Sequence, residues 1–343
     1  MQKIGRIFSD DELKFLLTAD DESVIQNLHK DARAITNKIY GNKIYIRGLV
    51  EFSNYCSQCC YYCGINSSNS SVKRFRLTEE EILQCAKLGY ERGFRTFVLQ
   101  GGEDPKFTDQ VFISIISKLK ENYPDCAITL SIGVREKNSY QKLKDAGADR
   151  FLLRFETARK DVFEKLHHKN QSLEKRIRAL KDLREVGFVT GTGFMVGAPY
   201  SSVESHIEDI KLIRELKTEM IGVGPFVPHN ATKFKDEVMG NLKMSLIILS
   251  ILRLENPYAL IPSTTALNTI DSNGRILGIL SGANVLMPNL SPNFAKENYS
   301  LYNDKQKNGL ESFDGLVGLK KLLKDYGFEI EITRGDYKGY GKN

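Results

Sequence analysis

Residues 44–66 read IYIRGLVEFSNYCSQCCYYCGIN. The first ten are rich in aliphatic and β-branched side chains, which predicts a strand. Four cysteines follow within eight positions, Cys56, Cys59, Cys60 and Cys63. In parallel α/β proteins, ligands bind at the carboxyl ends of the strands. The stretch therefore predicts an α/β fold with a site directly after its first strand.

Strand-like segments rich in Val, Ile, Leu and Phe alternate with amphipathic helical segments eight times from this stretch onward. Such alternation is typical of βα units with a parallel sheet, and eight units in roughly 250 residues is the count of a closed (β/α)₈, TIM-type barrel. An open doubly wound sheet would suit fewer strands and a reversal of strand order. We therefore expect the barrel. Its predicted strands cover residues 44–53, 96–102, 127–133, 150–156, 188–197, 220–226, 258–266 and 283–289.

The sequence outside the eight units divides into two flanking parts. Residues 1–42 are expected to form an N-terminal helical segment, the barrel to cover 43–303, and 304–343 to form a C-terminal extension packed on the barrel. The extension should contain a helix, GLVGLKKLLKDYG, and an extended end, FEIEITRG. Within the barrel, Thr78 precedes three glutamates and is a natural helix N-cap.

Composition limits the classes of protein. The 343 residues are 41% hydrophobic and 27% charged, as in ordinary globular proteins. The net charge of +6 is mild, and no segment concentrates basic and aromatic residues, so we expect no nucleic-acid binding. The start resembles no signal peptide and no apolar run reaches the length of a membrane span, which predicts a soluble, cytoplasmic protein. Cys85 and Cys126 are expected to be buried.

Three kinds of site compete for the C-x₃-C-x₂-C pattern of Cys56, Cys60 and Cys63. Structural zinc prefers two separated ligand pairs, and no second pair exists. A redox dithiol would use Cys60 and Cys63 and leave Cys56 unexplained. A [4Fe–4S] cluster held by three thiolates leaves one iron free to bind a small molecule. We favour the cluster, with Cys59 unligated, although a shifted register stays open.

The cysteine loop resembles the signature of the radical S-adenosylmethionine (SAM) superfamily, in which the open iron binds the amino and carboxylate groups of SAM. Tyr62 occupies an aromatic position typical of those enzymes. The resemblance implies a [4Fe–4S] cluster on Cys56, Cys60 and Cys63, SAM as cofactor, and reductive cleavage of SAM to methionine and a 5′-deoxyadenosyl radical. Such a site should be closed to solvent and sensitive to oxygen.

Further strand ends match the superfamily. The stretch GGEDP, with Gly101, Gly102 and Glu103, resembles its Gly-Gly-Glu turn, whose backbone meets the methionyl ammonium. Taken alone, it is equally consistent with a glycine-rich βα turn. Arg154 and Glu156, two residues apart in RFET, should share one face of a strand. Two charges there are tolerable only beside a polar ligand or each other.

The resemblance also assigns roles to these charged residues. It implies that Glu156 binds the ribose hydroxyls and that Arg154 and Arg176 hold the SAM carboxylate. For Arg176, a solvated helix face is the alternative. The segment GFMVG, with Met195, and the segment GVGPF (222–226) resemble the strand ends that receive adenine.

The whole stretch 43–303 resembles the HydE family of [FeFe]-hydrogenase maturases. This family resemblance implies a reaction on an iron-bound cysteine complex carrying carbon monoxide and cyanide. The implied partners are the maturases HydG and HydF and an electron donor such as ferredoxin or flavodoxin. The matching pieces are VEFSNYC, YYCGI, VLQGGEDP, LLRFETA, MVGAP, GVGPFVPH, PSTTALNTI and GANVLMPNLSP.

Several polar and soft side chains could line a substrate cavity. Hydroxyl groups can donate hydrogen bonds to cyanide nitrogen, and methionine offers adaptable packing, although helix capping and core packing are ordinary alternatives. His229 could donate to a substrate or serve a structural role. The cavity candidates are Thr264, Thr265, Met287, Tyr299 and Tyr302.

Other functions remain as alternatives. Biotin synthase needs a second cluster on later cysteines, and no cysteine follows Cys126. That absence also excludes a cysteine-ligated C-terminal accessory cluster. A methylornithine synthase shares the barrel and a GEDP-like turn, but PSTTA and MPNLSP favour the maturase. A non-catalytic iron–sulfur electron carrier or a zinc-stabilised interaction module would not need Arg154 and Glu156.

Overall fold

Six parallel strands form the central sheet of the computed structural model, which describes residues 5–305 and 315–339. Neighbouring strands pair in parallel register, as Val98 does with Thr129. The predicted α/β fold with a parallel sheet is confirmed. In spatial order the six strands are β2 (Gly48–Ser53), β3 (Thr96–Gly101), β4 (Ala127–Ser131), β5 (Arg150–Leu152), β6 (Val189–Thr192) and β8 (Met220–Ile221).

Short contacts continue the strand order beyond β8. Met220 forms an isolated bridge with Leu260, and Pro262 forms one with Val285. Val285 begins β10 (Val285–Leu286), which pairs in parallel with β1 (Lys43–Ile46), the segment that leads into β2. The eight predicted strand segments are therefore linked in a ring, but two of the links are single bridges. The expected regular barrel is met only in part.

Two predicted strands are shorter than expected. The segment 150–156 is a strand only as far as Leu152, because Glu156 adopts a left-handed φ of 72° that an extended strand cannot contain. The segment 258–266 contributes only the two bridges, and helix α10 (Thr265–Ile270) begins before its end. A separate two-stranded sheet pairs β7 (Met195–Val196) with β9 (Gly224–Pro225).

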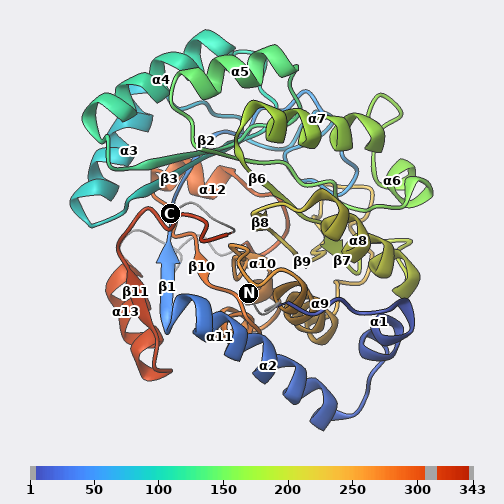
Figure 1. The fold of residues 1–343 in the computed structure, drawn as a ribbon. Coiled ribbons are helices and arrows are strands. Elements are labelled where there is room, and N and C mark those ends of the chain that lie inside the picture. The colour runs from blue at the N-terminus through green and yellow to red at the C-terminus, as the bar shows by residue number, and fades with distance from the viewer. Residues whose placement is uncertain (1–4, 306–314, 340–343) are drawn as a thin grey trace.

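Helices cover the outer side of the strands, and Figure 1 shows α3, α4, α5 and α7 in a row along that side. As predicted, Thr78 caps α3, and Glu81 completes a capping box. The helices that follow the strands are α3 (Glu79–Glu91), α4 (Asp109–Asn122), α5 (Lys137–Asp145), α6 (Lys160–Leu166), α7 (Leu173–Val186), α8 (Val203–Leu216), α9 (Leu242–Glu255), α11 (Gly274–Leu280) and α12 (Asn293–Asn298).

The N-terminal part contains the two predicted helices, α1 (Asp10–Leu17) and α2 (Glu22–Tyr40). Buried side chains of α2, such as Leu28, face α9, whose own residues are nearly all buried. Cys85 and Cys126 are buried, as predicted. None of the helices in the described ranges has both the length and the apolar character that crossing a membrane requires.

The C-terminal part contains α13 (Leu316–Asp325) and β11 (Glu329–Glu331). The extended end does more than pack outside the strands, because β11 pairs in parallel with β1 and adds a strand to the sheet. Beyond it, Asp336 Oδ1 lies 2.8 Å from Nη2 of Arg150, whose side chain is fully buried. This ion pair holds the segment around Asp336 against the start of β5.

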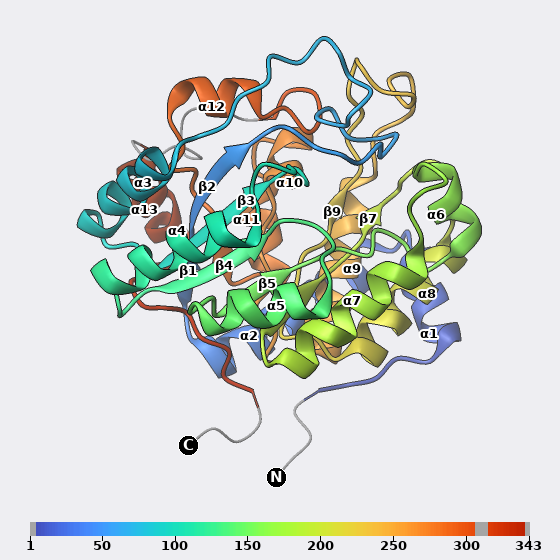
Figure 2. The same ribbon diagram turned by 90° about the horizontal axis from the view of Figure 1, so that it is seen from above.

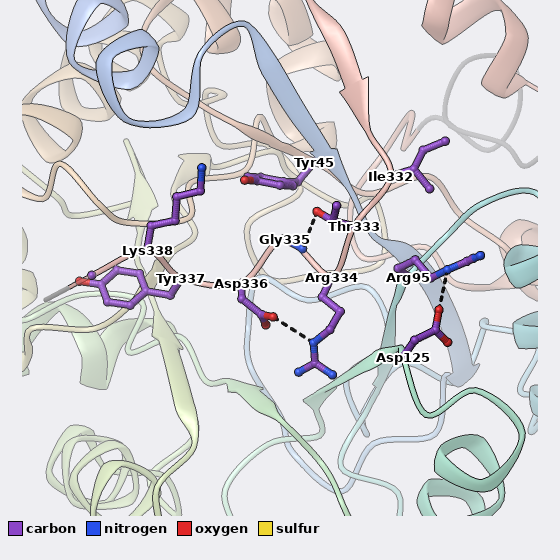
Figure 3. Close-up of a pocket in the computed structure, with 11 residues that line it drawn as sticks. Tyr45, Arg95, Asp125, Ile332, Thr333, Arg334, Gly335, Asp336, Tyr337 and Lys338 are labelled. Atoms are coloured by element: carbon purple, nitrogen blue, oxygen red, sulfur yellow. Dashed lines mark hydrogen bonds and ion pairs between the residues drawn. The ribbon is translucent and has the colours of Figure 1, made fainter. Parts of the chain in front are cut away.

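A hollow of about 670 Å³ lies beside this C-terminal segment, at the amino ends of the strands. Figure 3 shows it between residues 332–339 and Tyr45, with Arg95 paired to Asp125. In Figure 2 the red C-terminal segment and the light-blue loop after β2 lie at opposite ends of the strands. The hollow is therefore remote from the cysteines.

We predict that Asp336→Asn lowers stability at neutral pH. Burial acts to raise the pKa of Asp336, but hydrogen bonds from Arg334 and Arg150 outweigh it, and the pKa falls below the ordinary 3.8. A depressed carboxyl pKa stabilises the fold above the unfolded-state pKa, and this contribution is lost as the pH falls through the folded-state value. Because Asp336 is partly exposed, we expect a loss of only about 1 kcal/mol.

Urea unfolding followed by circular dichroism measures this loss. The midpoint of Asp336→Asn should lie below that of the wild type at pH 7, and the difference should shrink as the pH falls below 3.8 and through the lower folded-state pKa of Asp336. Asp31→Asn, on the exposed face of α2, is the matched control. Equal midpoints at pH 7 would contradict the proposed tie.

Candidate functional site

A cavity of about 360 Å³ lies at the carboxyl ends of the strands, opposite the C-terminal hollow. Its wall includes the ends of β2 to β5 and the cysteine loop, residues 54–66. Figure 2 shows this loop, α12 and the segment before α9 at the same end of the molecule. Every residue predicted above to bind the cluster or SAM lines the cavity, and so does every substrate-cavity candidate.

Arg74 holds the cysteine loop in shape. Its guanidinium donates hydrogen bonds to the carbonyl oxygens of Ile65 at 2.8 Å, Asn66 at 2.6 Å and Asn69 at 3.1 Å, and to that of Asn54. The loop has no helix or ladder of its own, so these carbonyls need side-chain partners. One rigid, multidentate donor group therefore fixes both ends of the loop.

Three of the four thiols in the cysteine loop line the cavity, and the fourth does not. Cys56, Cys60 and Cys63 line the cavity, whereas Cys59 Sγ lies 2.7 Å from the hydroxyl of Ser68, outside the lining. Among the residues that the structure describes, no three His, Cys, Asp or Glu side chains converge on one metal-ion position. A zinc site would need such convergence, while a cubane binds each thiolate through a different iron and needs the thiols spread around it.

Backbone and amide groups surround the sulfurs. The N–H groups of Gln58 and Glu103 each lie 3.4 Å from Cys56 Sγ, and the Gln171 amide lies 3.5 Å from Cys60 Sγ. Burial raises the pKa of Cys60 to about 11 and also raises the pKa of Cys56. These raised pKa values favour neutral thiols at pH 7, so binding of a metal would release their protons.

The glycine-rich turn after β3 presses against the cysteine loop. A Cβ on Gly102 would lie 2.1 Å from the carbonyl oxygen of Tyr55, so no other residue fits there without displacement. Asp104 locks the turn in place, because its Oδ2 accepts hydrogen bonds at 2.6 Å from both Ser53 and Arg76. The turn and the loop thus form one rigid wall.

Arg154 and Glu156 both point into the cavity, although neither lies on a strand. Arg154 Nη2 and Glu156 Oε2 are 2.9 Å apart, but their angles do not make a hydrogen bond. In the described structure these two atoms and Arg154 Nε are buried and lack a hydrogen-bond partner. Arg154 and Glu156 therefore retain hydrogen-bonding capacity that a polar ligand in the cavity could use.

Arg176, on α7, also lines the cavity and does not occupy a solvated helix face. Its Nη1 donates to the Arg154 carbonyl at 2.8 Å. Burial acts to lower the pKa of Arg176, but the charges available on Tyr62, Cys60 and Glu156 outweigh it and raise that pKa. The cation is thereby stabilised beside the thiols.

His167 is a contributor that the sequence did not predict. Its Nδ1 lies 2.9 Å from the Phe163 carbonyl, which can only accept, so Nδ1 carries the proton and Nε2 accepts from the Tyr62 hydroxyl at 3.2 Å. Cys60 forms an isolated bridge with the same residue. Burial, followed by the charge of Arg176, lowers the pKa of His167 to about 3. The neutral imidazole orients Tyr62.

Of the two roles considered for His229, the structure favours the structural one. Its ring packs against Gly64, where an added Cβ would lie 2.4 Å from His229 Cδ2, and it does not line the cavity. Its Nδ1 accepts from the N–H of Ala231 at 3.0 Å. The contact with Gly64 of the cysteine loop positions the His229 ring.

The substrate-cavity candidates all line the same cavity as the cysteines and Arg154. Thr264 is the N-cap of α10 without a capping side-chain bond, and its buried Oγ1 has no hydrogen-bond partner within the described ranges. Tyr299 is almost fully buried, and burial raises the pKa of both Tyr299 and Tyr302. Thr265 and Met287 complete this group.

Glu51 and Lys305 form a buried ion pair in the lining of the same cavity, which the sequence did not predict. Their side chains are 0% and 8% exposed. Glu51 Oε2 also accepts from Asn289 at 2.8 Å, and the Lys305 ammonium donates to the Tyr299 carbonyl at 2.9 Å. The same ammonium lies 4.6 Å from the centroid of the Tyr299 ring, a cation–π contact. In the sequence, the only indication of this ion pair was Glu51 itself, a charged residue within the apolar strand segment VEF.

Comparisons with known proteins agree with this geometry. The family model of the radical SAM superfamily matches residues 50–213. The [FeFe] hydrogenase maturase subunit HydE of Thermotoga maritima is 39% identical over 300 residues, 88% of this chain and 85% of that protein. The 3-methylornithine synthase of Methanosarcina acetivorans is 31% identical over 82% of this chain and 79% of its own. A crystal structure of a methylornithine synthase superposes with a TM-score of 0.82 at 25% identity, covering 95% of both chains.

We predict that Cys60→Ala prevents loading of an iron–sulfur cluster, because two cavity thiols cannot hold three irons of a cubane. After anaerobic treatment with iron and sulfide, the variant should lack the visible absorption and bound iron of the wild type. Cys59→Ala is the matched control and should load like the wild type, since its thiol lies outside the cavity. Loading of Cys60→Ala together with failure of Cys59→Ala would show that the register is shifted.

Proposed function

Since the chain belongs to the radical SAM superfamily, we propose that it is a hydrogenase maturase that cleaves SAM and acts on an iron–cyanide–carbonyl complex of cysteine. In this proposal the product contributes to the H-cluster of an [FeFe]-hydrogenase. The 39% identity to HydE of Thermotoga maritima over most of both chains supports the assignment. The observation that carries it is one cavity lined by three thiols, by the Arg154–Glu156 ion pair with its unsatisfied hydrogen-bonding atoms, and by the buried Glu51–Lys305 pair.

The residues present fit a [4Fe–4S] cluster and SAM. Cys56, Cys60 and Cys63 supply three thiolates, and backbone N–H groups stand ready to hydrogen-bond the sulfur of Cys56. The buried atoms of Arg154 and Glu156 that lack partners fit a charged ligand with hydroxyl groups. When bound, such a cluster supplies one electron to SAM, which splits into methionine and a 5′-deoxyadenosyl radical.

In this proposal, different residues bind different parts of the SAM molecule. Glu156 accepts hydrogen bonds from the ribose hydroxyls, and Arg154 and Arg176 hold the carboxylate. The backbone of the turn 101–103 receives the ammonium, and Met195 packs on the adenine. These groups bind and orient SAM, and the closed cavity excludes water that would quench a radical.

Other residues of the cavity lining suit a polar substrate. Thr264 Oγ1 and the Lys305 ammonium can donate hydrogen bonds to cyanide nitrogens or a carboxylate, while Met287 offers soft packing. We propose that HydG supplies the complex, that HydF receives the product, and that a ferredoxin or flavodoxin provides the electrons. These partners follow from the similarity to HydE alone.

A second candidate function is the isomerisation of lysine to 3-methylornithine. The 31% identity to the synthase of Methanosarcina acetivorans and the superposition with a methylornithine synthase favour it. The buried Glu51–Lys305 pair is compatible with either substrate, because both present a carboxylate. The reaction products therefore decide between the two functions.

Anaerobically reconstituted protein should form 5′-deoxyadenosine from SAM and dithionite, measured by liquid chromatography. The iron–cyanide–carbonyl cysteine complex should raise this rate by about tenfold or more, because substrate completes the closed site. Lysine should leave the rate unchanged. Stimulation by lysine with release of 3-methylornithine would favour the second function, and the absence of deoxyadenosine from loaded protein would contradict both.

Lysine 305 gives a test of the proposed substrate contacts. Lys305→Met should lower turnover of the substrate complex about tenfold and leave the Kd of SAM within about twofold, because one charged hydrogen bond to substrate is lost. This variant also strands the Glu51 carboxylate, so the charge-balanced Glu51→Gln/Lys305→Met protein is the control. Recovery of turnover in the double variant would mean that Lys305 only neutralises Glu51.

A further inference from the structure

Glu156 and Met195 lie on neighbouring segments where the strand pairing is short, since β7, which contains Met195, pairs with β9 at two positions. Glu156 forms a single bridge with Phe194, and its carbonyl accepts from the N–H of Met195 at 3.1 Å. The left-handed φ of 72° at Glu156 is unfavourable for a residue with a side chain. Such a conformation persists only where neighbouring structure enforces it. The source of that restraint lies outside the cavity.

A buried histidine and aspartate on α8 contact both segments. His206 is 1% exposed and Asp209 is 0% exposed. The N–H of Gly197, two residues after Met195, lies 3.2 Å from His206 Nε2. The N–H of Ala158, two residues after Glu156, donates to Asp209 Oδ1 at 2.5 Å. His206 Nδ1 and Asp209 Oδ2 are 3.1 Å apart and join the two contacts.

The partners of His206 determine its tautomer. A backbone N–H can only donate, so Nε2 is the acceptor for Gly197 and cannot carry a proton. The proton of the neutral ring is therefore on Nδ1, which donates to the Asp209 carboxylate. The rings of Phe194 and His206 also stack at 6.1 Å, and Phe194 stacks on Phe155 at 5.8 Å. The histidine is fixed by hydrogen bonds at both nitrogens and by a ring at its face.

We propose that His206 and Asp209 are positioning residues for SAM, which hold the segments of Glu156 and Met195 at their binding separation. The inference rests on the proposed function, since it requires these segments to bind SAM. Neither His206 nor Asp209 lines the cavity, so both act through the backbone of Gly197 and Ala158. The pair pre-organises the ribose and adenine sides of the site before SAM arrives.

Asp209→Asn tests the proposal with little change in volume. Asp209 accepts from the hydroxyl of Thr157 and from two N–H groups, that of Ala158 and Nδ1–H of His206. An asparagine can accept from only one of these N–H groups, because its NH₂ must face the other. Facing His206, the NH₂ moves the imidazole proton to Nε2, which then opposes the N–H of Gly197. Facing Ala158, it releases that segment instead.

We expect the Kd of SAM for cluster-loaded Asp209→Asn to rise about tenfold, measured by equilibrium dialysis without reductant. The rate of SAM cleavage at saturating SAM should stay within about twofold of the wild type, because no reacting group has changed. In cluster-free protein labelled with ¹⁵N-histidine, NMR should show the wild-type proton on Nδ1 of His206. A wild-type proton on Nε2 would overturn the assignment.

Two substitutions of His206 separate its contacts. His206→Asn keeps a donor near Asp209 but removes the acceptor for Gly197, whereas His206→Gln places an amide oxygen near the N–H of Gly197. The glutamine variant should therefore bind SAM more tightly than the asparagine variant. His29→Asn is the control, because His29 bonds Ser250 on the outer helices and should leave the Kd of SAM unchanged.

The results distinguish this inference from the proposed function. Wild-type affinity for SAM in folded Asp209→Asn and His206→Asn would overturn the positioning role. An equal loss in His29→Asn would show a general loss of stability and would also overturn it. Failure of the loaded wild type to bind SAM would contradict the proposed function, and the NMR result would still report the geometry of the pair.

Discussion

The hydrogen bonds from Arg74 to the carbonyls of Asn54, Ile65, Asn66 and Asn69 are the constraint on which the site depends. The cysteine loop contains turns but no helix, so several carbonyls at its two ends have to be satisfied by a side chain. The guanidinium group of Arg74, in the segment that follows β2, donates these hydrogen bonds. The three cavity thiols are consequently held in position before any metal binds, and the ordering cost falls on folding rather than on binding.

The irregular segments that follow the strands around the cavity are each held by a pair of interacting side chains. β5 ends at Leu152, which frees Arg154 and Glu156 to turn inward, and each released segment is then tied down by a buried pair. The Asp104–Arg76 contact fixes the glycine-rich turn, and the His206–Asp209 pair fixes the neighbouring segments. These side-chain contacts add to the backbone hydrogen bonds that continue past β5, such as those from the N–H groups of Leu153 and Phe155 to the carbonyls of Gly191 and Gly193.

Local patterns predicted much of this molecule. Apolar runs located the strands, the Thr78 capping box located α3, and the cysteine spacing selected the three thiols in the cavity. The early end of β5 was missed because a positive φ at Glu156 reflects tertiary restraint and not residue preference. The Glu51–Lys305 pair joins residues 254 positions apart, and such contacts leave no local pattern to recognise.

The pairing of β11 with β1, together with the Asp336–Arg150 contact, stops the lower end of the ring of strands. The C-terminal segment thus covers the amino ends of the strands, whereas the cavity with its three thiols lies at the carboxyl ends. The contacts that complete the ring and the groups that line the cavity are therefore at opposite ends of the strands, so a change in one need not disturb the other.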